Sequence, residues 1–183
     1  RISKKCFVPL SVGGWIEDLN DVNQVISLGA EKVIMNTKVI NNPKLISDTS
    51  NKYGNQCVVI SIDVKKIGNE YIIHTDRGKK PSNLNLLKWI EKIQALGCGE
   101  IFINCINNDG MRKGYDLNLL KSIRPKVNVP IIAMGGVLNW NHLVAGIKEG
   151  YADAVAYANL LHYTELSALK AKKYMLREKI NVR

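Results

Sequence analysis

The stretch PLSVGGW, residues 9–15, occurs nearly twice in this chain, because PIIAMGG follows at residues 130–136. Each copy begins with a proline, continues as a short apolar run and ends near glycines. An apolar run that stops at glycine is typical of a buried strand followed by a tight turn. The repetition therefore indicates two halves of similar construction, each entered through such a strand.

The spacing after the glycines supports the same division. Asn36 follows Gly13 by 23 positions, and Asn159 follows Gly135 by 24. Each asparagine stands where the next strand is expected to end. Two tandem halves that close into one barrel place such copies symmetrically, whereas a doubly wound sheet reverses direction midway. We therefore predict a (β/α)8 (TIM) barrel rather than a doubly wound sheet.

The rest of the chain alternates β-rich apolar runs with helical patterns, which is typical of parallel α/β folds. Strands are predicted at 6–12, 32–36, 57–63, 100–105, 129–134 and 153–158. Helices are predicted near 17–28, 43–53, 84–96, 116–125, 139–149 and 164–179. The strands are apolar almost throughout, so we expect both faces of the sheet to be covered.

Two features depart from the regular alternation. KKIGNEYIIHTDRGKK predicts a β-hairpin excursion at about 64–80. Six strands are also two fewer than an eight-stranded barrel needs. We therefore expect residues 1–183 to form a single partial barrel domain, with strands three to eight present and the first two βα units missing.

Composition excludes several classes of protein. The 26 basic and 16 acidic residues give a net charge of +10, but the lysines are scattered and form no stripe with aromatic residues, so nucleic acid is not a predicted partner. No apolar run approaches the roughly 18 residues of a membrane span. With no signal peptide in view, we expect a cytoplasmic address and no membrane partner. Four cysteines without metal-ligand spacing are expected to be free, buried thiols, and no metal or cofactor is predicted.

Glycine-rich turns at the carboxyl ends of barrel strands expose backbone N–H groups that suit an anion. Two related turns, Gly13–Gly14 and Gly135–Gly136, favour a ligand with a phosphate at each end. For either turn alone, a plain tight βα turn remains the alternative. Asparagines near strand ends add neutral donors and acceptors for a polar ligand; they are Asn36, Asn104, Asn107 and Asn159.

Asp63 has the best position for acid–base chemistry. It is expected to end the strand VVISID, and barrel active sites lie at that end of the strands. The alternative is an aspartate that caps the turn into the hairpin. Asp109 and Gly110 either line a phosphate site or form an ordinary Asp-Gly turn, and Asp116 is predicted to cap the following helix. His74 is expected at the surface.

Together these residues resemble the cyclase subunit of imidazole glycerol phosphate synthase, from histidine biosynthesis. The likeness runs from about residue 7 to residue 183 and is carried, in order, by VGGWI, GAEKVIMNT, NPKLI, YGNQCVVISIDVKK, LGCGEIFINCINNDGMRKGYD, PIIAMGG and INVR. It implies a (β/α)8 barrel and a cyclase (lyase) that receives ammonia from a glutaminase partner of the class I glutamine amidotransferase type. The implied substrate is a ribulosyl aminoimidazole carboxamide ribotide with two phosphates. The implied products are imidazole glycerol phosphate and an aminoimidazole ribotide.

The resemblance also assigns roles to residues. Asp63 corresponds to the second catalytic aspartate of the family, and the first lies on a strand that precedes this chain. One phosphate site is implied at Gly14, Asn36 and Thr37, and the other at Asp109, Gly110, Gly136, Ala158 and Asn159. Asn104 and Gly135 complete the predicted substrate-binding set. Lys32 and Glu100, which begin two strands, match two members of a charged gate for ammonia at the other end of the barrel.

Several residues at the expected mouth depart from the pattern of the family. Trp15 stands where the family has a third glycine, and its indole is expected to crowd the first phosphate. Asn104 replaces a threonine, Asn107 an aspartate, and Met134 and Asn159 each a serine. Changes confined to the mouth of a retained scaffold suggest a different substrate. One alternative is thus a relative that forms an acetamidino group on a nucleotide-linked sugar for surface glycans. A second alternative is an inactive fragment, because the first aspartate of the catalytic pair is missing from residues 1–183.

Overall fold

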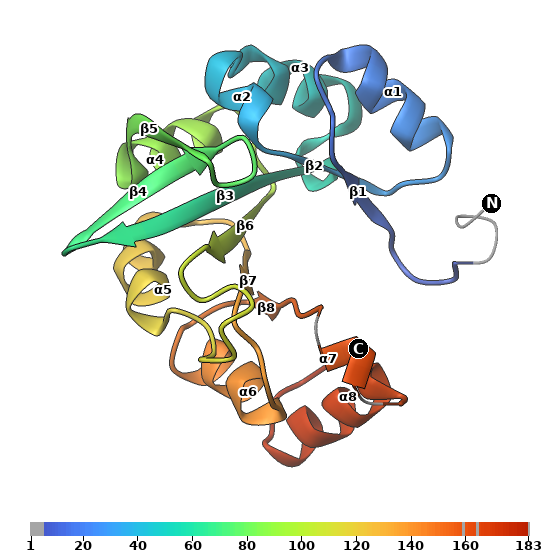
Figure 1. The fold of residues 1–183 in the computed structure, drawn as a ribbon. Helices are drawn as coiled ribbons and strands as arrows, with labels where there is room; N and C mark the ends of the chain where they lie inside the picture. The colour runs from blue at the N-terminus through green and yellow to red at the C-terminus, as the bar shows by residue number, and fades with distance from the viewer. Residues whose placement is uncertain (1–5, 159, 164, 183) are drawn as a thin grey trace.

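The computed structural model describes residues 6–158, 160–163 and 165–182. Six parallel strands follow one another in chain order across a single curved sheet, β1-β2-β3-β6-β7-β8 (Figure 1). Their bounds are β1 Ser11–Gly13, β2 Lys32–Met35, β3 Val58–Ile67, β6 Glu100–Cys105, β7 Ile131–Met134 and β8 Ala154–Val155. A doubly wound sheet would reverse this order, so the parallel α/β sheet has the arrangement of a barrel wall.

The helices lie around the outside of the curved sheet (Figure 1). Their bounds are α1 Leu19–Ser27, α2 Thr37–Asn41, α3 Lys44–Tyr53, α4 Leu86–Ala95, α5 Leu117–Ile123, α6 Trp140–Lys148, α7 Leu160–Tyr163 and α8 Ser167–Arg177. Short polar side chains begin several of them, as helix starts require. Asp116 caps α5 as predicted, because its carboxylate accepts a hydrogen bond from the Leu119 backbone N–H at 2.9 Å.

The two faces of the sheet differ in burial. Along β3, Ile60, Ile62 and Val64 are buried under the helices, whereas the intervening Ser61 and Asp63 are only half-buried. The same alternation runs through β2, β6 and β7. The expectation that both faces are covered is therefore wrong: helices seal one face, and the other lines an open, concave side of the sheet.

The outer strands and the last helices differ from their predicted bounds. The strand expected at 6–12 is confined to 11–13, and the one at 153–158 to 154–155. Among the described residues, both lie at the edges of the sheet and bond to one neighbouring strand, which limits the length of a regular ladder. The helix expected at 164–179 is α8 at 167–177, with α7 as a separate turn before it, and α2 is a helix that the sequence patterns did not predict.

The excursion expected at about 64–80 is an antiparallel extension of β3. This strand continues to Ile67, pairs with β4 (Glu70–Thr75), and β4 pairs with β5 (Lys80–Asn85). The helix predicted from 84 therefore starts later, after Asn85. His74 on β4 is 4% exposed, so the expected surface position is wrong. The reason is pairing, since β4 lies against β3 with His74 opposite Asp63.

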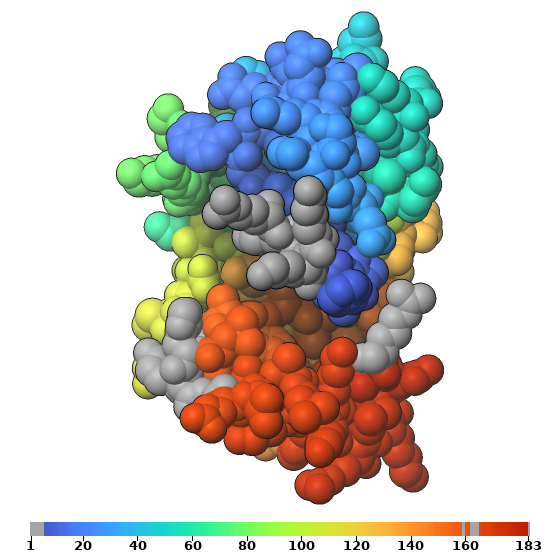
Figure 2. Space-filling model, turned by 90° about the vertical axis from the view of Figure 1, so that its right-hand side faces the viewer, coloured from blue at the N-terminus to red at the C-terminus, as the bar shows by residue number. Residues whose placement is uncertain are grey.

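The first and last parallel strands bound the open side of the sheet. Among the described residues, β1 pairs only with β2, and β8 only with β7. Figure 2 views the molecule from that side, with the blue-to-cyan N-terminal elements above and the orange-to-red C-terminal helices below. Within the part of the chain that the structure describes, no helix combines the length and hydropathy of a membrane span.

Candidate functional site

Asp63 lies inside β3, at the point where the strand changes partners. Its neighbour in the parallel ladder is Asn104 on β6, and its neighbour in the antiparallel ladder is His74. The predicted position at the end of the strand is therefore corrected, because β3 runs on for four residues beyond it. Asp63 nevertheless marks the end of the parallel wall, where β3 leaves the sheet that the helices cover.

Two carboxamides from the flanking strands hold the Asp63 carboxylate. Asn36, directly after β2, donates from Nδ2 to Oδ2 at 2.8 Å, and Asn104 donates from Nδ2 to Oδ1 at 3.0 Å. Hydrogen bonds to a carboxylate are stronger than those between neutral groups. The orientation of the Asp63 side chain therefore depends on both neighbours.

The other ends of these carboxamides are unused. Asn36 Oδ1 and Asn104 Oδ1 are buried and have no hydrogen-bond partner among the described residues. A buried acceptor without a donor costs about 1–3 kcal/mol. Groups of this kind are rare in folded proteins, and each lacks a donor that the described residues do not supply.

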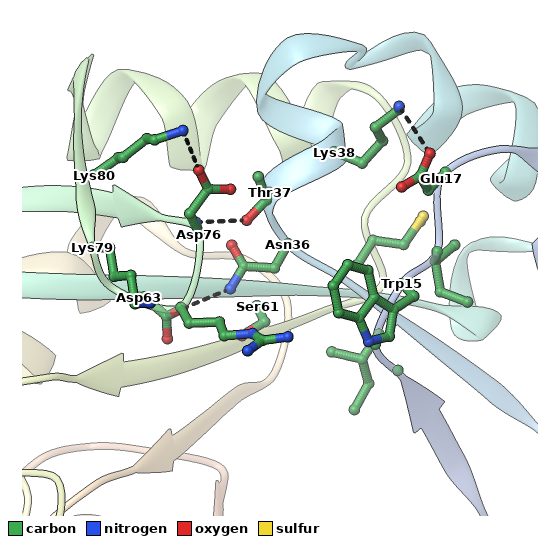
Figure 3. Close-up of a pocket in the computed structure, with 16 residues that line it drawn as sticks. Trp15, Glu17, Asn36, Thr37, Lys38, Ser61, Asp63, Asp76, Lys79 and Lys80 are labelled. Atoms are coloured by element: carbon green, nitrogen blue, oxygen red, sulfur yellow. Dashed lines mark hydrogen bonds and ion pairs between the residues drawn. The ribbon is translucent and has the colours of Figure 1, made fainter.

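A cavity of about 820 Å³ opens on the Asn36 side of Asp63 (Figure 3). Its lining includes the predicted residues Gly14, Asn36, Thr37 and Asp63, together with Trp15 from the turn after β1. The turn between β4 and β5 forms the opposite wall. It is tied to α2 because the Asp76 backbone N–H donates to Thr37 Oγ1 at 3.1 Å.

The lining of this cavity carries four cations and three carboxylates, namely Lys38, Arg77, Lys79, Lys80, Glu17, Asp63 and Asp76. Two of the cations are paired, Lys80 with Asp76 at 2.7 Å and Lys38 with Glu17 at 3.4 Å. The hydrogen bond from Lys80 to Asp76 raises the pKa of that lysine. Among the described residues Lys79 has no carboxylate partner, so the cavity keeps positive charge for an anion.

A second, smaller cavity of about 50 Å³ lies at the same end of the sheet. It is lined by residues of the other predicted phosphate site, which the structure brings together: Asp109, Gly110, Gly135, Gly136 and Ala158. Met134 also lines it. Asn159 lies outside the described residues. Asn104 stands between the two cavities, because a Cβ added at Gly135 would lie 3.0 Å from its Oδ1.

The two glycine turns correspond with a shift of one residue from the sequence-based match. Aligning Pro9 with Pro130 pairs Gly14 with Gly135, and these two glycines share φ values of 102° and 103°. In the strand registers, Val12 pairs with Val33 and Ala133 pairs with Val155. The position in the second half that is equivalent to Asn36 is therefore Ala158, not Asn159. The predicted match of the two asparagines is therefore wrong by one position, since spacing alone does not fix register.

Trp15 is the counterpart of Gly136 in this alignment. Both adopt a left-handed backbone, with φ of 60° and 86°. The Gly136 position has no room for a side chain, because a Cβ there would lie 2.4 Å from the Gly114 carbonyl oxygen. The turn after β1 is not pressed against such a loop, so it accommodates an indole.

Lys32 and Glu100 lie at the amino ends of β2 and β6, at the far end of the concave face. They form an ion pair, with side chains 26% and 19% exposed. Val59 on β3 is the register neighbour of Glu100 and separates the two strands. The structure thus joins the two residues predicted for a gate, and it places them away from Asp63.

The remaining residues considered for chemistry are Asn107, the cysteines and possible metal ligands. Asn107 lies outside both cavities, since its Oδ1 accepts from the Lys66 backbone N–H at 2.7 Å and its Nδ2 donates to the Lys66 carbonyl at 3.2 Å. All four cysteines are free, as predicted, but Cys6 and Cys57 are only half-buried, so the expected burial is correct for Cys98 and Cys105 alone. Burial raises the pKa of the Cys98 thiol to about 12, which makes it a poor nucleophile. Among the described residues, no group of three or more His, Cys, Asp or Glu is placed to hold a metal ion.

Sequence reasoning missed the contribution of the β4–β5 turn. The sequence patterns assign Arg77 and Lys79 only to a hairpin and to the net charge of the chain. In the structure both residues line the larger cavity. The guanidinium of Arg77 lies 5.2 Å from the centre of the Trp15 ring. The signal available in the sequence was the density of charge in TDRGKK, residues 75–80, at the tip of an excursion.

Comparisons with known proteins agree on one family. Residues 1–167 match the family model described as "Histidine biosynthesis protein". Proteins named "Imidazole glycerol phosphate synthase subunit HisF" from Prosthecochloris aestuarii and Chlorobium phaeobacteroides are 43% and 42% identical over 183 residues. A protein of the same name from Chlorobium phaeovibrioides is 42% identical. Each alignment covers the whole of this chain and 73% of the relative.

Proposed function

The chain belongs to the histidine biosynthesis protein family, and from that premise we propose that it is the cyclase subunit of an imidazole glycerol phosphate synthase. The reaction joins ammonia to a ribulosyl aminoimidazole carboxamide ribotide that carries two phosphates, and releases imidazole glycerol phosphate and an aminoimidazole ribotide. The observation that carries the proposal is the identity across the whole chain to relatives of that name.

Asp63 acts as the acid–base group in this proposal. Its carboxylate lies beside the larger cavity and is held by Asn36 and Asn104, so a bound substrate would meet a base of fixed orientation. A positioned general base contributes typically 10²–10⁴-fold to a rate. The orphaned Oδ1 atoms of the two asparagines would accept hydrogen bonds from the N–H or O–H groups of the substrate.

The two phosphates occupy the two cavities in this proposal. Gly14, Asn36 and Thr37 would serve one phosphate, and Asp109, Gly110, Gly135, Gly136, Ala158 and Asn159 the other. The support is their placement: the described members line two separate cavities at the same end of the sheet, with Asn104 between them. A ligand that spans both cavities would pass over Asp63.

The opposite end of the concave face would receive ammonia from a glutaminase partner. Lys32 and Glu100 form an ion pair there, and apolar or small side chains lie between that pair and Asp63 on the same face, including Ser61 and Phe102. A charged pair at the entrance of an otherwise less polar path suits control of a small polar molecule. The names of the relatives, which are subunits, support a partner of this kind.

We further propose that residues 1–183 form a single domain of a (β/α)8 barrel that two preceding βα units complete. The support is the sequential order of six parallel strands, the unpaired outer edges of β1 and β8 among the described residues, and the coverage of 73% of each relative. Two added units would pair with both edges and close the wall.

Complementation of a histidine auxotroph by the gene with its upstream codons tests the function. We expect growth with the unchanged gene and none with Asp63→Asn, which keeps the size of the side chain and removes the base. Asp48→Asn on the outer helix α3 is the matched control and is expected to support growth. Failure of the unchanged gene despite soluble expression would contradict the histidine role.

One observation favours a second candidate. Trp15 places an indole in the cavity that Asp63 lines, and Asn104 bonds a carboxamide to Asp63, where the family resemblance implies a glycine and a threonine. The same ammonia chemistry could then serve a nucleotide-linked sugar, converting an acetamido group to an acetamidino group. Loss of complementation together with ammonia-dependent amidination of such a sugar would favour this candidate.

A further inference from the structure

We infer that Trp15 and Arg77 select a ligand in which a planar heteroaromatic ring is joined to a phosphate group. This inference rests on the proposed function and deepens it, because it names the residues that recognise the ring. The two side chains come from turns distant in sequence, the one after β1 and the one between β4 and β5. They meet across the cavity that contains Asp63.

The backbone at both positions is strained. Trp15 and Arg77 each have φ of 60°, in the left-handed region that large side chains rarely adopt. Such conformations persist where the surrounding structure imposes them, and they cluster at binding sites. Gly136, the counterpart of Trp15 in the second half of the chain, has the same handedness without a side chain. A glycine would therefore be sufficient for the backbone of the turn after β1, so the turn geometry does not explain the presence of an indole there.

The indole is held in the open. Trp15 is 80% exposed, whereas Trp89 is 3% exposed and packs in the core. Trp15 points from its turn toward the cavity in Figure 3. The Arg77 guanidinium lies over this ring, 5.2 Å from its centre. A planar cation on an otherwise exposed ring occupies the place that a planar ring takes in stacking.

The same turn supplies charge for a phosphate. When a ring displaces the guanidinium from the indole, Arg77 is free to form two parallel hydrogen bonds to phosphate oxygens. Lys79, two residues along, lines the cavity and has no carboxylate partner in the described part of the chain. Lys38 and Lys80 are already paired with Glu17 and Asp76. Neighbouring side chains would thus bind the two parts of the ligand, with Trp15 contacting the ring and Arg77 and Lys79 contacting the phosphate.

Three probes that share one phosphate group separate these contributions in titration calorimetry on the 183-residue chain. Ribose 5-phosphate has no ring, aminoimidazole carboxamide ribotide adds an imidazole, and uridine 5′-monophosphate adds a pyrimidine. Stacking of a base on an aromatic side chain corresponds to about a 5- to 150-fold gain in affinity. We expect a gain in this range over ribose 5-phosphate for at least one ring, and the tighter of the two identifies the ring that the site prefers.

Variants assign the gain to its residues. Trp15→Gly should abolish the preference for a ring and leave the affinity for ribose 5-phosphate unchanged, and its backbone conformation suits glycine, so the fold is retained. Arg77→Ala should weaken the two ring-bearing probes more than ribose 5-phosphate, because only a ring displaces the guanidinium from the indole toward the phosphate. Tyr151→Gly is the matched control, because Tyr151 also has a left-handed backbone (φ 57°) and an exposed aromatic ring (58%) but does not line the cavity.

The outcomes are distinguishable. A ring preference that survives Trp15→Gly, or no preference in the unchanged chain while ribose 5-phosphate binds, overturns the inference and leaves the proposed function standing. Absence of binding by all three probes contradicts the phosphate pocket of the proposed function and the inference with it.

Discussion

Asn104→Ala is expected to leave the stability of the protein nearly unchanged, although it removes a hydrogen bond to a carboxylate. The bond joins Asn104 Nδ2 to Asp63 Oδ1 at 3.0 Å. Hydrogen bonds to charged groups contribute about 1.5–3 kcal/mol. Asp63 is only half-buried and lines an open cavity of about 820 Å³, so its carboxylate stays partly hydrated and we expect the loss at or below the lower end of that range.

The same substitution removes a cost of comparable size. Asn104 Oδ1 is buried without a donor among the described residues, and such an acceptor costs about 1–3 kcal/mol. The two contributions oppose each other, so the net change in the free energy of unfolding should stay within about 1 kcal/mol. Turnover should fall in contrast, because Asp63 loses one of the two donors that orient it.

Urea denaturation followed by circular dichroism measures the change in stability. Asn85→Ala is the comparison, since it removes a hydrogen bond of 3.1 Å to the Lys88 backbone N–H at the start of α4 and relieves no recorded orphaned acceptor. Loss of such a cap costs about 0.5–2 kcal/mol. If Asn104→Ala destabilised the protein by more than about 2 kcal/mol, Asn104 Oδ1 would have to accept a hydrogen bond in the folded protein. The predicted compensation between the two contributions would then be refuted.

Three other predictions use the same molecule. In the same denaturation assay, Gly136→Ala should destabilise the protein by about 3–5 kcal/mol and Gly14→Ala by about 1–2 kcal/mol. Both glycines have a left-handed backbone, but of the two only Gly136 has a carbonyl oxygen where a Cβ would lie. Equal losses of stability would contradict this packing. Burial raises the pKa of Cys98 to about 12, so the unfolded chain releases that proton first and stability should fall by about 1.4 kcal/mol per pH unit above about pH 9; Cys98→Ala should remove this share of the alkaline slope, and an unchanged slope would refute it. Lys32→Glu should impair glutamine-dependent turnover more than turnover with added ammonium salts. The double variant Lys32→Glu with Glu100→Lys, which exchanges the two charges, should recover part of the glutamine-dependent turnover. If Lys32→Glu lowers both turnovers equally and the double variant recovers nothing, the ion pair has no role in ammonia entry.

Local patterns predicted the parallel strands and most of the helices, because apolar runs, glycines and capping residues act over a few residues. Asp116 at the start of α5 is an example, since its side chain bonds three residues ahead. Bounds were wrong at β1 and β8, where the ladder depends on a neighbour at the edge rather than on apolar character. The half-open inner face was also not predicted, because burial depends on how many strands close the wall.

The candidate site was predicted in part. Asp63, Asn36 and the glycine turns carry the resemblance and lie together at one end of the sheet. The contribution of Arg77 was missed, because it comes from an excursion whose tip folds back over α2.

By itself, the sequence determined the order of strands and helices, the family, and the residue types available for chemistry, because periodicity and short-range capping are properties of the chain. Only the tertiary structure decided which of those residues meet. The one-residue correction that matches Trp15 to Gly136, and the contact between Trp15 and Arg77, depend on strand register and on the path of a hairpin. Both arise from hydrogen bonding between segments far apart in sequence, which spacing along the chain does not specify.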